Sequence, residues 1–348
     1  MTRRVLAAHD RNLVARVVDR WPLVYSAEAD CRQDRPAHVR AGSGMVMIGG
    51  NIAAIQDDAH FVAVVDTNGR TVAAIALPVG HQGHRQFDAM RGNKKWKSDL
   101  EACTTIVESG RELLLIMGSG SNARREQILI INWPPKNEQD IKLFQAKSFY
   151  ATLHSQLDFA GCELNIEGAV LLGDDCLRLF QRGNGAENIG QVPLNATCDI
   201  SWQWLRGHLH DPASVSSPRP QNIIQYDLGF LDGVRLGFTD GALRNGAMFF
   251  TATAEASPDS VVDGPVMGSV LGRIDGDGTA RWAELWDSDG TRFPGKVEGL
   301  VLDPAVERRA WILIDQDNPQ VPSELCEIEL CGGWMAPGRP LPAAWNPT

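Results

Sequence analysis

The strongest constraint on the fold of this chain is a repeat that runs along it. A small or acidic residue, followed in most cases by glycine and then by an apolar strand, returns at intervals of 58, 66, 65 and 66 residues. Self-similarity of this period is the signature of repeat architectures. The repeats open at Ser43, Glu101, Glu167, Asp232 and Glu298.

Each repeat predicts four short antiparallel strands. In the first repeat these are residues 45–48, 51–55, 61–65 and 71–77, and in the third they are residues 168–172, 176–181, 190–194 and 221–228. Turn-forming sequences separate the strands, and no amphipathic helix of ten residues interrupts them. Such units are typical of propeller blades. We therefore expect an all-β chain that forms one domain, residues 1–348, as a five-bladed β-propeller. A sixth blade within residues 1–40 is the alternative.

The predicted blades span residues 36–90, 91–155, 156–221, 222–288 and 289–348. The last blade offers only three clear strands, at residues 298–302, 310–314 and 325–330. Its missing strand is expected from residues 1–20, where Val5–Ala8 and Leu13–Val18 are apolar. Pairing of the two chain ends would close the ring and remove an exposed sheet edge.

The residues that open the repeats predict a metal site. The innermost strand of each blade lines the central channel, so equivalent residues of these strands meet around one axis. Several carboxylates in a narrow channel either bind protons or are neutralised by a cation. Oxygen ligands without histidine or cysteine suit Ca²⁺, which takes about six to eight of them. The predicted calcium ligands are Ser43, Glu101, Glu167, Asp232 and Glu298.

Side chains two residues earlier on each strand should point the same way. They are Ala41, Asp99, Asn165, Phe230 and Lys296. Alternatives to the metal site stay open. Arg235 or Lys296 could pair with the acids inside the channel, or the register of a blade could differ, so that its acid is an ordinary turn residue.

Loops after the second strand of each blade should form the rim of a funnel above the acids. Guanidinium groups bind phosphates and carboxylates well, so the expected partner is a small anionic ligand, unless the loop arginines are simply solvated. The residues predicted to contact it are Arg124, Arg125, Arg182, Asn184, Asp315 and Asp317.

The charge balance argues against two classes of partner. The formal net charge is −10, and no basic stripe occurs. We expect no nucleic-acid binding, which requires clustered positive charge, and no binding to anionic membranes. The N-terminus lacks the apolar stretch of a secretory signal, and no apolar run reaches the ~18 residues of a membrane span. Seven cysteines include no Cys-x-x-Cys pair, which suits a reducing compartment. The expected location is cytoplasmic.

Two motifs, Asn165-Ile166-Glu167-Gly168 and Lys296-Val297-Glu298-Gly299, resemble a known pattern. Calcium-activated nucleotidases of the apyrase type are five-bladed propellers that hold a calcium ion in the channel with Ser and Glu residues, one per inner strand. The bacterial esterase-like phytase propellers repeat a similar strand opening. The resemblance extends over most of the chain as a pattern, and it implies the same fold and a Ca²⁺ cofactor. Other polar motifs of nucleotide hydrolysis are missing from the sequence.

Two classes of function follow, and the sequence does not decide whether the chain is an enzyme. In the first, a metal-dependent hydrolase acts on a phosphoester or another ester, with calcium polarising an oxygen or activating water and with Asp99 or Glu167 as the base. In the second, the calcium ion is structural and the propeller is a binding or scaffold protein without chemistry. A lactonase or glycosidase propeller is a weaker third alternative.

Overall fold

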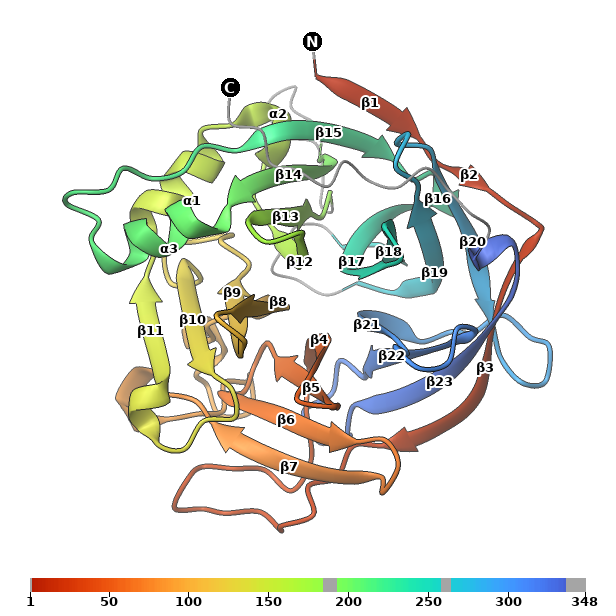
Figure 1. Cartoon of the computed structure of the whole chain (residues 1–348). Helices are drawn as coiled ribbons and strands as arrows, with labels where there is room; N and C mark the ends of the chain where they lie inside the picture. Colours follow the sequence, from red (N-terminus) through yellow and green to blue (C-terminus); the bar gives the residue numbers. More distant parts are fainter. Residues whose placement is uncertain (1, 184–192, 258–263, 336–348) are drawn as a thin grey trace.

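Most of the chain is β-strand, arranged as sheets around a central axis (Figure 1). The computed structural model describes residues 2–183, 193–257 and 264–335. In this part of the chain, successive antiparallel sheets stand side by side, and in most of them the first strand along the chain lies nearest the axis (Figure 1). The architecture is therefore propeller-like, as the repeat predicted.

The first two sheets contain four antiparallel strands each. The first sheet consists of β4 (Gly42–Ile48), β5 (Asn51–Gln56), β6 (Phe61–Asp66) and β7 (Thr71–Ala76). The second consists of β8 (Leu100–Glu108), β9 (Arg111–Gly118), β10 (Gln127–Asn132) and β11 (Ile141–Gln145). The strands predicted for the first repeat are confirmed to within about two residues at most ends.

The third sheet is joined by a strand from the start of the chain. It consists of β12 (Ile166–Leu172), β13 (Cys176–Gln181), β14 (Asn195–Ser201), β15 (Gln221–Asp227) and, parallel to β15, β1 (Arg3–Leu6). The third strand of this repeat, predicted at residues 190–194, is β14, which begins at Asn195; residues 193 and 194 precede it, and residues 190–192 lie outside the described part of the chain.

Short helices flank the third sheet. They are α1 (Lys147–His154), α2 (Leu157–Ala160) and α3 (Trp202–His210). None reaches ten residues, and no helix among the described residues has the length and apolar character needed to cross a bilayer. Single 3₁₀ turns occur at His81–Gly83, Lys94–Trp96, Glu138–Asp140 and Gly333–Met335.

The remaining strands form one ten-stranded sheet with two halves. One half consists of β16 (Phe230–Leu231), β17 (Val234–Arg244), β18 (Ala247–Glu255), β19 (Val266–Ile274) and β20 (Ala280–Trp286), with β2 (Ala8–His9) beside β20. The other consists of β21 (Lys296–Leu302), β22 (Arg309–Asp315), β23 (Glu324–Gly332) and β3 (Leu13–Pro22). The halves join where β20 and β3 run parallel for two residue pairs.

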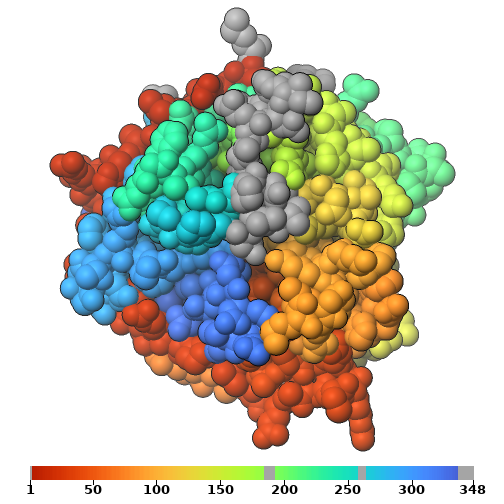
Figure 2. Space-filling view, turned by 180° about the vertical axis from the view of Figure 1, so that it is seen from behind, coloured from red at the N-terminus to blue at the C-terminus, as the bar shows by residue number. Residues whose placement is uncertain are grey.

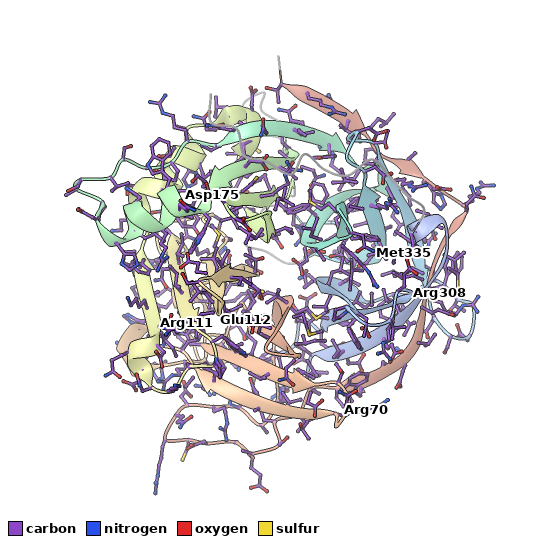
Figure 3. The ribbon with its side chains drawn as sticks, viewed as in Figure 1. Arg70, Arg111, Glu112, Asp175, Arg308 and Met335 are labelled. Atoms are coloured by element: carbon purple, nitrogen blue, oxygen red, sulfur yellow. The ribbon has the colours of Figure 1, made fainter. Side chains whose placement is uncertain are left out.

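The pairing of β3 with β23 confirms the predicted closure by an N-terminal strand. The two strands are antiparallel from Pro22 opposite Glu324 to Leu13 opposite Gly332. At the outer edge (Figure 3), Arg70 extends this seam to the first sheet. Its guanidinium pairs with Asp19 of β3 and lies 4.5 Å from the ring centre of Trp21.

Apolar side chains fill the wedges between neighbouring sheets. Between the second and third sheets, α1 inserts Phe149, Tyr150 and Leu153, all fully buried. The Tyr150 hydroxyl donates to the carbonyl of Gly118 at 2.7 Å. Between the third sheet and the half of the ten-stranded sheet that contains β17, Phe180 and Phe238 pack edge to face with ring centres 5.2 Å apart. This packing fixes the distance between the inner strands.

The innermost strands form a closed ring of contacts. Around the ring, each strand contacts the next in the order β4, β8, β12, β17 and β21, and β21 contacts β4. The five inner strands therefore surround one axis (Figure 1).

Candidate functional site

Every innermost strand carries a β-bulge near its beginning. In each case the pairing with the second strand of the sheet skips one residue. A bulge leaves that residue unpaired and re-aims its side chain. Because the strands form a ring, we infer that these residues lie at one level of the channel. From β4 to β21 they are Ser43, Glu101, Glu167, Thr239 and Glu298.

Asp232, the predicted fourth ligand, lies outside this ring. It occupies the turn between β16 and β17 with a φ of 49°, and its side chain is 55% exposed. Its carboxylate pairs with Arg292 Nη1 at 2.5 Å. The short β16–β17 hairpin adds residues between the start of this repeat and its bulge. A prediction from the constant repeat spacing therefore falls on Asp232 in the hairpin turn, whereas the bulge is at Thr239. Phe230, in the same hairpin, is exposed as well.

The two hydroxyl residues of the ring are already hydrogen-bonded. Ser43 Oγ donates to the carbonyl of Leu100 in the next sheet. Thr239 Oγ1 donates to Thr251 Oγ1 at 3.0 Å. The charged members of the ring are therefore Glu101, Glu167 and Glu298.

Arg182 enters the channel beside two of these acids. Its Nη1 lies 3.4 Å from Glu167 Oε1 and 3.7 Å from Glu298 Oε1, and its Nη2 lies 2.7 Å from Glu255 Oε2. Burial acts to lower the pKa of Arg182, but Glu167, Glu298 and Glu255 outweigh it, and the pKa is raised. The guanidinium is thus a fixed positive charge inside the channel.

Lys296 is a second internal cation. Its Nζ lies 2.8 Å from Asp317 Oδ1, 3.5 Å from Glu298 Oε1 and 3.8 Å from Asp315 Oδ2. The alternative that Lys296 pairs with channel acids therefore holds. Arg235 instead donates to the carbonyl of Pro193 at 3.0 Å.

A third group of charges lies on the side of the first two sheets. Lys97 Nζ is 2.5 Å from Asp57 Oδ2 and 2.8 Å from Asp99 Oδ1, and Arg125 Nη1 is 2.8 Å from Asp99 Oδ2. Burial acts to raise the pKa of Asp99, but Lys97 and Arg125 outweigh it, so the pKa is lowered. Asp99 is therefore an ionised, doubly paired group and a poor base.

Burial has the largest effect on the charge state of two ring acids, Glu101 and Glu298. Burial raises the pKa of both carboxyls well above the usual range, although Lys97 acts against this at Glu101 and Lys296 at Glu298. Among the described residues, neither carboxylate oxygen of Glu298 has a hydrogen-bond partner. A buried carboxylate in this state binds either a proton or a cation.

One group of carboxylates has the spacing of a metal site. Asp57, Asp99 and Glu101 each bring one oxygen within 4.8 Å of the others. An all-oxygen donor set fits Ca²⁺. Sequence reasoning predicted Glu101 as a ligand and Asp99 as a base, but it did not assign Asp57 to the metal. Asp57 directly follows β5, in the loop after the second strand of its blade, which was expected on the rim of the funnel.

The predicted rim residues divide into different environments. Arg125 and Arg182 are buried in the ion pairs described above, and Asp315 and Asp317 surround Lys296. Arg124 is exposed, with its guanidinium 4.5 Å from the ring centre of Trp96. Asn184 lies outside the described residues. Seen from behind (Figure 2), the blue C-terminal unit and the orange segment before β8 face each other across the middle of the molecule.

Asp240 crosses the channel below the ring. Its buried carboxylate accepts from Gly241 N at 2.7 Å and from Leu300 N at 2.8 Å, and it also accepts from Met45 N. Burial raises the pKa of Asp240 well above the usual range, although these N–H groups act to lower it. Met45 and Leu300 follow the ring residues of β4 and β21, so Asp240 ties three inner strands together.

Known structures resemble the chain only distantly. Glutaminyl cyclase of Myxococcus xanthus has 11% identity and a TM-score of 0.45 over 95% of this chain and 99% of its own. Regucalcin, a calcium-binding protein from Agrobacterium tumefaciens, has 11% identity and a TM-score of 0.38 over 99% and 100%. An endo-1,5-α-L-arabinanase of Thermotoga petrophila has 10% identity and a TM-score of 0.41 over 83% and 70%.

No curated protein matches the sequence. The comparisons do not show the resemblance to calcium-activated nucleotidases or esterase-like phytase propellers. A family model, described as a family of unknown function (DUF6929), matches residues 38–330, which is most of the chain. The chain therefore belongs to the DUF6929 family.

Proposed function

We propose that this chain is a five-bladed propeller that binds Ca²⁺ among the carboxylates of its channel. The ten-stranded sheet divides at the β20–β3 contact into two blades, β17–β20 with the short strands β16 and β2, and β21–β23 with β3. With the other three sheets this makes five blades. The ion is held by Asp57, Asp99 and Glu101. Glu167 lies on the neighbouring inner strand β12, and Glu298 lies on β21, which does not adjoin β8 in the ring.

The excess of acids over bases at the ring and its rim carries this proposal. Among the described residues, eight carboxyl groups that take part in these ion pairs or in the metal-like group face only four basic side chains. The acids are Asp57, Asp99, Glu101, Glu167, Glu255, Glu298, Asp315 and Asp317, and the bases are Lys97, Arg125, Arg182 and Lys296. A divalent ion would remove two units of this excess.

The chemistry best suited to such an ion is hydrolysis of a phosphoester or another ester. A bound Ca²⁺ polarises the oxygen under attack and offsets the negative charge that develops on it. Glu167 suits the role of base better than Asp99, because burial raises its pKa even though Arg182 acts to lower it. The exposed Arg124 would contact the anionic end of the substrate.

A structural ion is the second candidate, and one observation favours it. The carboxylates come from different blades: Asp57 follows β5, Glu101 belongs to β8 and Glu298 belongs to β21. An ion bound to them ties these blades together without any chemistry. The protein would then be a binding or scaffold propeller.

Elemental analysis of the purified chain and melting curves with calcium or EGTA test the ion. We expect close to one calcium per chain and a lower melting temperature in EGTA. Glu101→Gln should weaken calcium binding, whereas the control Asp232→Asn should not, because Asp232 lies outside the ring. Absence of bound calcium together with identical melting curves would overturn the proposal.

Chromogenic aryl phosphates and aryl esters then separate the two candidates. Calcium-dependent turnover that disappears in Glu167→Gln, with calcium binding retained, supports the hydrolase. Calcium binding without turnover of any of these substrates supports the structural ion.

A further inference from the structure

The ammonium group of Lys97 lies where the ion of the proposed site would bind. Asp57, Asp99 and Glu101 are the described carboxylates with metal-site spacing. The Nζ atom is already within 2.8 Å of two of them, Asp57 and Asp99. An incoming cation and this ammonium cannot share these oxygens at close range, because like charges a few ångströms apart repel strongly in a poorly hydrated channel.

The charge balance of this exchange depends on the ion. A monovalent ion that replaces the ammonium brings no additional positive charge, yet it must lose its own hydration. A divalent ion brings one further unit of charge to a site in which the carboxylates of Asp99, Glu101 and Glu167 repel one another. The exchange is therefore favourable for a divalent ion and unfavourable for Na⁺ or K⁺.

The displaced side chain has a place to go. Lys97 also lines a pocket of about 200 Å³ on the same face of the ring. The pocket carries acids of two other segments, Asp88 and Asp317, each of which already pairs with a basic side chain, and Phe87 lines it as well. The side chain of Lys97 is long and flexible, so rotation about its own bonds can move the ammonium away from the three carboxylates of the proposed site and toward the acids of the pocket.

We propose that Lys97 is an internal counter-ion that excludes monovalent cations from the channel site and yields to a divalent one. This inference rests on the proposed function, because it concerns the same carboxylates. It adds a residue that determines the specificity of the site. Arg125 does not share this role, because it pairs with Asp99 alone among the three carboxylates.

Calcium titration calorimetry of the EGTA-treated full chain tests the inference. The variants are Lys97→Met, the charge-retaining Lys97→Arg and the control Lys95→Met, whose lysine is exposed and lies 5.6 Å from the Trp96 ring. We expect Lys97→Met to bind calcium at least about tenfold more tightly than the wild type, because a like charge has gone from the site. The other two variants should stay near the wild type.

Each titration is repeated in NaCl and in choline chloride at equal ionic strength. Sodium should weaken calcium binding to Lys97→Met and leave the wild type unchanged. If Lys97→Met melts early in EGTA, the calcium-induced rise in its melting temperature serves as the readout, and it should exceed that of the wild type.

The outcomes separate the two proposals. Equal or weaker calcium binding by Lys97→Met, beside a wild type that binds, overturns the role of Lys97 alone. Binding by Lys97→Met but not by the wild type overturns calcium as the resident ion, and it also overturns the exchange, because Lys97 then does not yield to a divalent ion. Binding by neither overturns both.

Discussion

The Asp240→Asn substitution tests whether the inner strands are held together below the ring. Asp240 accepts hydrogen bonds from Gly241, Leu300 and Met45, and it is 1% exposed. Asparagine has the same shape but only one acceptor oxygen, so its amide N–H₂ would face at least one backbone N–H group. The backbone N–H group and the buried amide N–H₂ would both lack an acceptor, at about 1–3 kcal/mol each, so we expect a loss of at least about 2 kcal/mol in the free energy of unfolding.

Urea unfolding followed by tryptophan fluorescence measures this loss, in EGTA so that no ion contributes. The matched control is Asp232→Asn, a neighbouring aspartate whose exposed ion pair with Arg292 is worth about 0–1 kcal/mol. If the two variants differ by less than about 1 kcal/mol, Asp240 does not hold the ring as we infer.

Three further results are expected. In EGTA, the free energy of unfolding should fall as the pH rises above 4.5, because Glu101 and Glu298 keep protons in the folded chain that the unfolded chain releases. Urea titrations at a series of pH values measure this dependence, and added calcium should make it weaker. Deletion of residues 2–22 should prevent folding, seen as loss of the β-sheet circular dichroism signal, since β23 loses its partner. Tyr150→Phe should cost about 1 kcal/mol in urea unfolding, through the lost hydrogen bond to Gly118, without changing calcium binding.

The sequence predicted the repeat and three charged members of the ring for one physical reason. Glu101, Glu167 and Glu298 each open a regular strand at nearly constant spacing, and a bulge keeps each at the same level. The fourth position was wrong because constant spacing assumes blades of constant length. Thr239 carries no charge, so nothing in its residue type distinguished it from other strand residues.

The cations of the site were harder to predict. Lys97 and Arg182 approach the ring from segments between strands, where loop conformation determines which side chains meet. Lys296 was identified as a possible partner because it lies on an inner strand, two residues before Glu298. The helix Lys147–His154 was missed because its eight residues are too few for a clear helical period.

The early segment that contains β1, β2 and β3 also affects how this chain is made. During synthesis it emerges long before its partners β15, β20 and β23. Until these strands are synthesised, the apolar residues Leu13, Ala15 and Val17 have no core to pack into, and the unpaired edge of β3 can pair with a strand of another chain. Contacts between such distant parts of a chain slow folding. In the folded chain the same segment pairs with the outer strands of three blades. None of these blades can separate from its neighbours unless this N-terminal segment also detaches.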